Sequence, residues 1–210
     1  IESEIALEDE SARQLTSVRE SREHELKSYL DQIQNEVVIM AQNDMIIQAL
    51  EDFEAGWARL NNPTEHLQRT FIQENPHPSG EKDKLVDPGT GTTYADAHKR
   101  YHPWFKDFQE RRGYYDVFLI NHEGKVAYSV FKEADFATNL ETGRWKDSDL
   151  ARVVRDVENN FRKGYVAFTD FNPYAPSDGA PASFIAAPIF DKAGEKHGIL
   201  VLQMPVGKIN

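Results

Sequence analysis

Two apolar runs joined by a short turn constrain the fold of this chain more than any other feature. The runs are Tyr114–Ile120 and Val126–Phe131, and Asn121-His122-Glu123-Gly124 lies between them. Both runs are rich in β-branched and aromatic residues, which favour strands, and Gly124 can adopt the positive φ that a tight turn requires. The pattern therefore predicts an antiparallel hairpin.

A second pair of apolar runs repeats this arrangement near the end of the chain. Ser183–Phe190 and Gly198–Met204 flank a polar turn that contains a glycine. Between the two pairs, Asp147 or Ser148 can cap a helix, and Tyr165–Phe171 has the composition of a strand. The order hairpin, helix, strand, hairpin predicts an α+β fold with a five-stranded antiparallel sheet and flanking helices.

The first 60 residues have the pattern of a long helix. With Arg22 standing in for one member, apolar residues recur in steps of three and four, as in a heptad repeat: Leu15, Val18, Leu26, Tyr29, Ile33, Val37 and Met40. A break is expected at Asn43-Asp44. Because so narrow an apolar stripe needs a partner helix, we expect a parallel homodimer through this helix. Residues 1–60 would then be a dimerisation and signalling helix, and residues 61–210 a single domain.

The segment between the long helix and the first hairpin is less regular. Thr64–Ile72 is expected to form a short helix, and Gln73–Thr93, rich in Pro, Gly, Asp and Lys, an irregular excursion. Tyr94–Arg111 then has a helical pattern. Pro103 within it is expected to kink the helix or to begin a new turn.

The composition excludes several classes of function. The formal net charge of -11 argues against nucleic acid as a partner, because nucleic-acid binding needs clustered Lys and Arg. The absence of cysteine excludes catalytic thiols, disulfides and thiolate metal sites. Since the chain opens on Ile1 and ends soon after a strand-like run, we expect a domain excised from a longer protein.

No catalytic motif is present. His98 and His102 are one helical turn apart and could share a metal, but the HExxH motif is absent, and surface or hydrogen-bonded histidines are the commoner outcome. There is no G-x-S-x-G elbow, and Gly89-Thr90-Gly91 is not a nucleotide fingerprint. We therefore expect no catalytic residues, no cofactor and no essential metal.

Four stretches carry a resemblance to a known family. They are YYDVFLINHEGKVAYSVFKEADFATNL from Tyr114, FTDFNPYAPSDGAPASFIAAPIF from Phe168, Asn75-Pro76-His77-Pro78 and Tyr101-His102-Pro103-Trp104-Phe105. Together with the order of elements, they resemble the extracytoplasmic PAS-like sensor domains, called PDC or Cache domains, of bacterial methyl-accepting chemotaxis proteins and related sensor kinases.

The resemblance implies a function. The chain would be the extracytoplasmic, periplasmic ligand-binding domain of a transmembrane chemoreceptor, bounded by two membrane spans of a cytoplasmic-membrane protein. The mixture of Lys132 with several aspartates suggests that its partner is a small polar metabolite, zwitterionic or carboxylate-bearing. The alternative is a ligand-free dimerisation or protein-interaction module of a sensor histidine kinase or cyclase.

A ligand pocket is expected between the sheet and three segments that cover it: the Tyr101–Phe108 helix and the Asp135–Asn139 and Asn172–Ser177 loops. Asp116 or Asp170 would meet an amine or another donor of the ligand; alternatively, an acid in the Tyr165–Phe171 strand would pair with Lys132 or with loop amides. The candidate ligand-binding residues are Tyr101, Trp104, Asp116, Phe118, Tyr128, Lys132, Asp135, Asp170, Tyr174 and Ser183.

Overall fold

The computed structural model describes the backbone of residues 2–205 and the side chains of residue 10 and residues 13–205. Ile1 and the chain end at 206–210, from which we inferred an excised domain, lie outside the described residues. Contacts divide the chain into two units, one ending at Glu36 and the other beginning at Val37. We call the second the globular unit.

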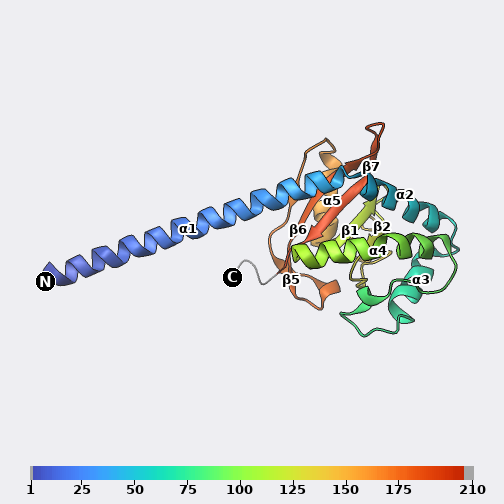
Figure 1. Cartoon of the computed structure of the whole chain (residues 1–210), viewed down its shortest axis with the longest axis horizontal. Helices are drawn as coiled ribbons and strands as arrows, with labels where there is room; N and C mark the ends of the chain where they lie inside the picture. Colours follow the sequence, from blue (N-terminus) through green and yellow to red (C-terminus); the bar gives the residue numbers. More distant parts are fainter. Residues whose placement is uncertain (1, 206–210) are drawn as a thin grey trace. The chain divides into compact units, whose positions relative to one another are not determined.

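The predicted long helix is present as α1, Glu2–Ala41 (Figure 1). Three apolar residues of its heptad-like stripe are exposed: Leu15 by 71%, Val18 by 58% and Leu26 by 42%. The last part of the helix contributes Val37 and Ala41 to the core of the globular unit. The stripe is therefore open to a partner only in its first part.

The predicted break after this helix is confirmed. Asn43 is the N-cap of α2, Asp44–Ala58, and its side chain accepts a hydrogen bond from the Met45 amide at 2.8 Å. Helix α2 buries one face, including Leu50 and Phe53, and packs against α4 and β2. The structure thus places α2 in the globular unit. The functional division of the chain into a dimerisation and signalling helix, residues 1–60, and a single domain, residues 61–210, stays a prediction.

The irregular middle segment also follows the expected order. Helix α3, Pro63–Gln68, continues into the π-helical turn η1, Arg69–Gln73, and a short 3-10 turn η2 covers Lys82–Lys84. Helix α4 runs over Thr93–Arg112. It continues through Pro103 as one helix, so the proline does not begin a new one.

The predicted five-stranded antiparallel sheet is confirmed, in the order β2-β1-β7-β6-β3. Both hairpins form, and the last strand, β7, lies at the centre. The strands are β1, Asp116–Asn121; β2, Val126–Ser129; β3, Ala167–Phe168; β6, Phe184–Phe190; and β7, Lys196–Gln203.

The third strand differs from its prediction. Only Ala167–Phe168 pairs with β6, whereas the sequence suggested a strand over Tyr165–Phe171. The chain then forms a separate two-stranded ribbon of β4, Asn172–Pro173, and β5, Pro181–Ala182, with the 3-10 turn η3, Ala175–Ser177, between them. The sequence had suggested a turn-rich loop here.

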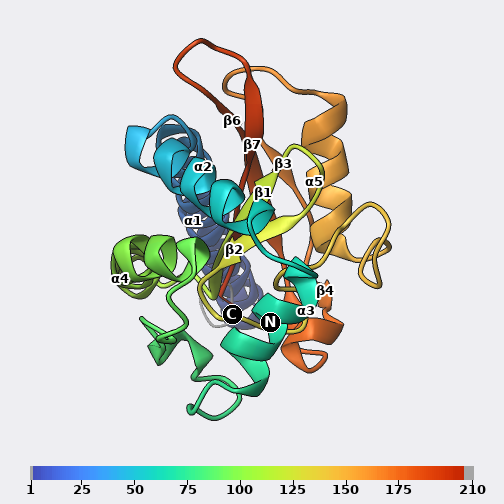
Figure 2. The same cartoon turned by 90° about the vertical axis from the view of Figure 1, so that its right-hand side faces the viewer.

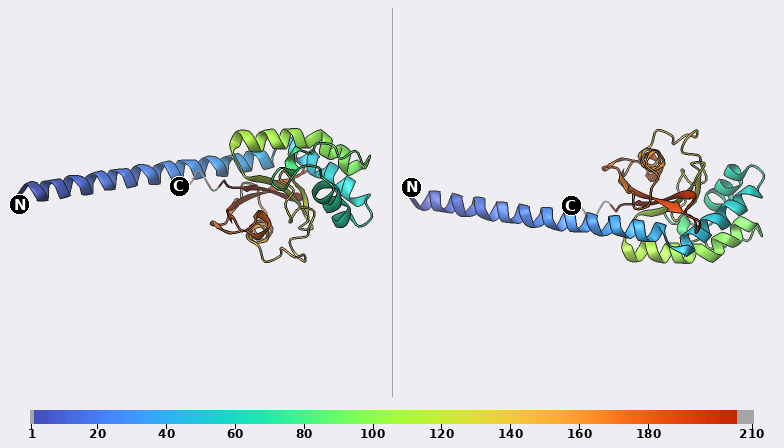
Figure 3. Two further views of the ribbon diagram at one scale, coloured as in Figure 1. Left: turned by 90° about the horizontal axis from the view of Figure 1, so that it is seen from below. Right: turned by 90° about the horizontal axis from the view of Figure 1, so that it is seen from above.

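Helices cover both faces of the sheet. Helix α5, Asp149–Asn159, lies on one face, and α2 and α4 lie on the other (Figures 2 and 3). We call these the α5 face and the α4 face. On the α5 face, α5 buries the apolar residues Leu150, Val153, Val154 and Val157. They share one hydrophobic core with strand residues that include Phe118, Ile120, Phe184 and Val201.

A β-bulge changes which face part of β2 presents. Ile120 pairs with Val126, but Leu119 pairs with Tyr128, so one residue of β2 is left over. Residues opposite each other share a face, and neighbours in β1 alternate between faces. Val126 and Tyr128 therefore point to opposite faces. Simple alternation along β2 would put them on the same face, but the extra residue, which the sequence does not reveal, changes this.

Gly198 in β7 allows α2 to approach the sheet closely. A Cβ atom at this position would lie 2.5 Å from Leu50 Cδ2 and closer still to the Ile120 carbonyl oxygen. We expect Gly198→Ala to destabilise the globular unit by about 1–3 kcal/mol, because the strand and α2 must separate. Urea denaturation measures this, with Lys192→Ala in the exposed β6–β7 turn as a control. Equal stability of the two variants would contradict the packing described.

Candidate functional site: a pocket beside helix α5

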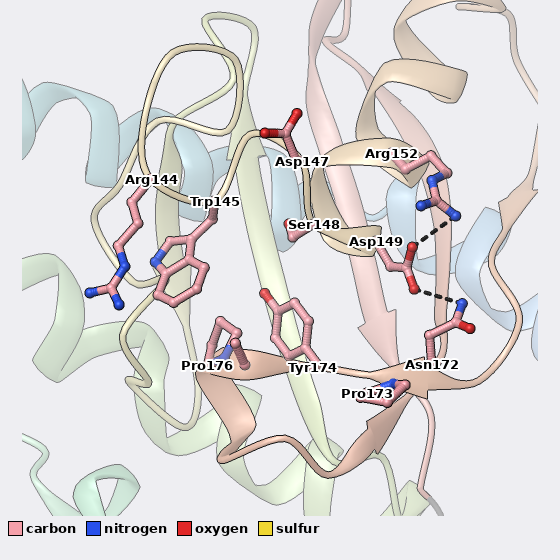
Figure 4. A pocket seen from close by; sticks show the side chains of 11 residues that line it. Arg144, Trp145, Asp147, Ser148, Asp149, Arg152, Asn172, Pro173, Tyr174 and Pro176 are labelled. Carbon is pink, nitrogen blue, oxygen red and sulfur yellow. Dashed lines mark hydrogen bonds and ion pairs between the residues drawn. The ribbon is translucent and has the colours of Figure 1, made fainter.

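A pocket of about 480 Å³ opens beside the N-terminal end of α5. Three segments form it: the turns before α5, the first turn of α5, and the segment from β4 to η3 (Figure 4). We call it the α5 pocket. Its lining residues are Arg144, Trp145, Asp147, Ser148, Asp149, Arg152, Asn172, Pro173, Tyr174, Ala175 and Pro176.

A helix cap, an ion pair and a hydrogen bond fix the pocket residues of α5 and β4 in place. Ser148 is the N-cap of α5, as expected, and accepts a hydrogen bond from the Ala151 amide at 3.2 Å. Asp149 in the first turn forms an ion pair of 2.9 Å with Arg152 and accepts a hydrogen bond of 2.8 Å from Asn172 Nδ2 (Figure 4). This network joins α5 to β4 and leaves positive and negative groups in one small pocket.

Trp145 lines a second pocket as well as the α5 pocket. Its indole Nε1–H donates to the Ala134 carbonyl at 3.0 Å, and the Arg144 guanidinium lies over its ring, 4.6 Å from the centroid. Both residues also line a pocket of about 310 Å³ with Gln68, Ile72, Gln73, Ala134 and Thr138. We call this the side pocket. Arg144 and Trp145 are therefore shared by the two pockets.

Three carboxyl groups lie behind the α5 pocket. Tyr174 lines the pocket, and its hydroxyl donates to Asp135 Oδ2 at 2.5 Å. Asp135 lies within electrostatic reach of Glu133 and of Asp116, the first residue of β1. We call Asp116, Glu133 and Asp135 the acid cluster. Asp116 and Asp135 are fully buried.

Burial and mutual repulsion govern the charge of the acid cluster. Burial, with a smaller contribution from Glu133, raises the pKa of Asp135 from 3.8 to about 7. The pKa of Asp116 is raised well above its usual range, first by burial and then by Glu133 and Asp135. Burial also raises the pKa of Glu133, although hydrogen bonds from Ser177 and Tyr115 oppose this. Asp116 and Asp135 are therefore easily protonated in this environment.

On the α4 face, aromatic residues and histidines are held by ring packing and hydrogen bonds. The Tyr101 hydroxyl donates to Asp52 Oδ2 of α2 at 2.5 Å. Tyr128 stacks on Phe53 with 4.8 Å between ring centroids and hydrogen-bonds His102 Nδ1 at 2.6 Å. These contacts fasten α2 and α4 to the sheet.

Lys132 is buried on this face with little polar support. Its Nζ donates to the Ser129 carbonyl and lies over three aromatic rings, nearest that of Tyr128 at 4.3 Å. Burial lowers the pKa of Lys132 to about 7, although Asp116 and Asp83 act against this.

The predicted site residues do not share one pocket. Asp116, Phe118, Asp135 and Tyr174 lie together on the α5 face, whereas Tyr101, Tyr128 and Lys132 lie on the α4 face. The expected pocket between the Tyr101–Phe108 helix and both loops is therefore wrong as drawn, because Tyr174 packs with the α5 face of the sheet, whereas α4 lies on the opposite face from α5 (Figure 2). The Asn172–Ser177 loop does contribute to the α5 pocket.

The other three predicted residues lie elsewhere. Trp104 is 39% exposed and stacks on Phe108. Asp170 was expected within a strand, but it is exposed and accepts a hydrogen bond from the Phe171 amide at 2.8 Å. Ser183 is buried and donates to the Thr169 carbonyl at 2.6 Å.

His98 and His102 share a helix face as expected, and their rings stack at 4.3 Å. His102 Nε2 contacts the Asp83 carbonyl at 2.7 Å, and His98 Nδ1 the Val86 carbonyl at 2.8 Å. These contacts hold the irregular 83–87 segment against α4. Among the described side chains, those of residue 10 and residues 13–205, no group of three or more His, Cys, Asp or Glu is placed to hold a metal ion.

Sequence reasoning missed most of the α5 pocket. It did not select Arg144, Trp145, Asp147, Asp149 or Arg152, nor Glu133 of the acid cluster. The available signal was a tryptophan in a polar, turn-rich stretch directly before a helix cap, where an isolated aromatic residue is exposed unless something covers it. Only the fold shows that β4 and η3 lie opposite this stretch.

The geometry can be compared with known proteins. No protein-family model matches the sequence, and no curated protein matches it. Among solved structures, the sensor domain of the histidine kinase DctB from V. cholerae superimposes with a TM-score of 0.51 at 13% identity, over 90% of this chain and 54% of that one. This chain has the PDC or Cache sensor fold. It spans about half the length of that sensor domain.

Two further solved structures are similar to a smaller extent. An extracellular ligand-binding receptor from Desulfohalobium retbaense gives a TM-score of 0.38 at 10% identity, over 79% of this chain and 25% of that one. The ligand-binding domain of the Pseudomonas aeruginosa amino-acid chemoreceptor PctC, in complex with GABA, gives 0.32 at 12% identity, over 83% and 66%. In the part of the chain that the structure describes, no helix is both long and apolar enough to cross a membrane.

Proposed function

We propose that this chain is the extracytoplasmic ligand-binding sensor domain of a membrane-anchored receptor. Two observations support the proposal: the fold, shared with the sensor domain of a histidine kinase, and a pocket on that fold with a mixed polar lining. The pocket is the stronger support, since a fold alone does not specify a function. In our proposal the receptor is a chemoreceptor of the methyl-accepting type.

The α5 pocket is the proposed ligand site. It combines two arginines, two aspartates, an indole and a phenol in about 480 Å³. Small-molecule sites have this character, with a few polar groups fixed in an apolar wall. The balance of charges suits a small polar metabolite, zwitterionic or carboxylate-bearing. Its carboxylate would meet Arg144 or Arg152.

Signalling in this proposal is a population shift without catalytic turnover. A ligand that binds one arrangement of the pocket more tightly than another shifts the equilibrium toward it. The Asp149 network couples the pocket to both α5 and β4, so both elements would respond. We propose that the change reaches the membrane through the segments that flank the globular unit.

The test is a thermal-shift screen of polar metabolites, followed by calorimetry of each hit. Trp145→Ala removes the wall of the pocket and should weaken binding of a hit by about tenfold or more. Trp104→Ala, which removes an exposed tryptophan from the α4 face, is the matched control and should bind as the parent does. Equal affinity in the parent and Trp145→Ala would place the ligand outside the α5 pocket.

The alternative function is a ligand-free dimerisation module of a sensor histidine kinase or cyclase. The exposed apolar residues of α1 favour this reading, because Leu15, Val18 and Leu26 are large and open to solvent. A parallel homodimer through α1 belongs to both proposals. The metabolite screen separates them, since the alternative predicts no hits.

Disulfide trapping tests the dimer directly, because the chain has no cysteine of its own. In a parallel pair of helices, Val18→Cys brings two identical thiols together across the seam, and mild oxidation should cross-link them. Arg19→Cys is the control, since the next residue points about 100° away around the helix. Equal cross-linking at both positions, or none at Val18→Cys, would rule out a parallel seam through Val18.

A further inference from the structure

The α5 pocket belongs to a row of three pockets that share lining residues. The side pocket shares Arg144 and Trp145 with the α5 pocket. A third pocket, of about 470 Å³, shares Gln68 and Gln73 with the side pocket and is completed by residues 62–65 at the start of α3. We call it the α3 pocket. The side pocket therefore lies between the other two.

One backbone carbonyl joins the two sides of the side pocket. The Ala134 carbonyl accepts hydrogen bonds from the Trp145 indole at 3.0 Å and from Gln68 Nε2 at 3.3 Å. Gln68 Nε2 also donates to the Phe136 carbonyl at 2.9 Å. The turn before α5 and the last residue of α3 therefore meet at one atom, although they lie far apart in the sequence.

An unusual helical turn forms another part of the side pocket. Ile72 and Gln73 belong to the π-helical turn η1, and both line the pocket. Such turns are rare and frequently occur at functional sites. The Gln73 side chain is exposed, so a ligand can reach its amide. The backbone geometry of η1 thus points to the same place as the shared lining residues.

The chemistry of the lining changes along the row. The α5 pocket contains four charged side chains, those of Arg144, Asp147, Asp149 and Arg152. The side pocket has only Arg144, and the α3 pocket only Glu65. The remaining polar residues of these two pockets carry amides or hydroxyl groups, which both donate and accept hydrogen bonds. This lining suits the hydroxyl groups of a ligand better than a charged group.

We propose that the row of pockets binds an elongated ligand, namely a sugar acid that carries at least one neutral sugar unit. Its carboxylate end lies in the α5 pocket, and the neutral unit lies in the side pocket. The indole of Trp145 suits this ligand, because it combines a large apolar ring with a polar edge, as a sugar ring does. The inference rests on the proposed function and names its ligand class.

The test compares acids that differ only in the number of neutral sugar units. Gluconate has none, lactobionate and maltobionate have one, and maltotrionate has two. The tighter-binding of lactobionate and maltobionate should bind the parent about tenfold or more tighter than gluconate in calorimetry. The reason is that the added unit gains neutral hydrogen bonds in the side pocket.

Two matched variants separate the pockets. Ala134→Trp fills the side pocket and should abolish the gain from the neutral unit, with the affinity for gluconate unchanged. Ala175→Trp fills the α5 pocket and should weaken every acid, gluconate included, by about tenfold or more. Both alanines are exposed, so the larger side chains do not have to enter the core.

Gln73→Ala tests the side pocket without adding bulk. It should weaken the longer acids by about fivefold and leave gluconate binding unchanged, because one neutral hydrogen-bonding group is lost. Gln48→Ala is the control, since Gln48 is an exposed glutamine of α2 that lines none of the three pockets. This variant should bind all the acids as the parent does.

Three results would overturn this inference: equal affinity for gluconate and the longer acids, the same gain in Ala134→Trp as in the parent, or hits that all lack a sugar unit. The proposed function stands in each case if Ala175→Trp weakens the compounds that bind. Unchanged binding in Ala175→Trp would overturn both. So would the absence of any hit, among the sugar acids and in the metabolite screen.

Discussion

The globular unit is expected to lose stability as the pH rises from about 4 to about 8, by roughly 4 kcal/mol through Asp135 alone. Burial raises the pKa of this carboxyl from 3.8 to about 7. The folded state therefore holds its proton more tightly than the unfolded state does. The resulting stabilisation is fully present below the unfolded pKa and is lost as the pH passes through the folded one.

Asp135→Asn should remove this contribution, because asparagine does not titrate. Its amide oxygen can still accept the Tyr174 hydroxyl, and its amide nitrogen supplies donors near free acceptors. The variant should match the parent in mild acid and exceed its stability above about pH 7. Part of the pH dependence should remain, since burial also raises the pKa of Asp116.

Urea denaturation over a series of pH values measures the effect, with Asp170→Asn as the control. Asp170 is exposed, so its removal should leave the curve of stability against pH as in the parent. Stability that rises with pH in the parent, or an unchanged curve in Asp135→Asn, would mean that the fold does not raise the pKa of Asp135. The charge state described for the acid cluster would then be wrong.

Phe53→Ala is expected to cost about 3–5 kcal/mol of folding stability. Phe53 is fully buried between α2 and the sheet, and its ring lies 4.8 Å from that of Tyr128 and 5.1 Å from that of Tyr94. Truncation removes these contacts and leaves a cavity that rigid neighbours cannot fill. Since domains of this kind are stable by roughly 5–15 kcal/mol, the variant should be close to unfolding.

Two variants calibrate this result. Phe53→Leu keeps most of the volume and should cost distinctly less. Phe168→Ala removes a phenylalanine that is 45% exposed in β3 and should change stability by no more than about 1 kcal/mol. A loss below about 1 kcal/mol in Phe53→Ala would show that α2 is not fastened to the sheet by this ring.

Local sequence patterns predicted the sheet and the helices well, because interactions between residues close together in the sequence determine these elements. Alternating β-branched and aromatic residues around Gly124 specify the β1–β2 hairpin, and Asn43 and Ser148 cap helices with their own side chains. The heptad-like spacing likewise marked α1. In each case a few neighbouring residues determine the structure.

The candidate site was harder because its geometry depends on distant contacts. The bulge in β2 transferred Tyr128 to the α4 face, and no residue type in the sequence marks that extra position. Within α4, Tyr101 and Phe105 form the buried row, while Trp104 falls on the neighbouring exposed row. An aromatic-rich helix does not by itself reveal which of its rings face the core.

The acid cluster shows a mixed outcome. Asp116, Asp135 and Tyr174 were selected from sequence and do lie together, because each interrupts or follows an apolar strand in which an acid or phenol needs a partner. Asp170 met the same criterion but is exposed, since β3 ends at Phe168 and the chain has already left the sheet. A strand pattern fails at sheet edges, where pairing stops early.

The indole signals of the three tryptophans give the most direct test of the ligand site. Trp145 lines the α5 pocket, Trp57 is largely buried in α2, and Trp104 is exposed on α4. In a proton–nitrogen correlation spectrum titrated with the tightest-binding metabolite, the Trp145 indole signal should move and the other two should stay in place. Movement of Trp104 with Trp145 unchanged, or no movement at saturation, would contradict a ligand site in the α5 pocket.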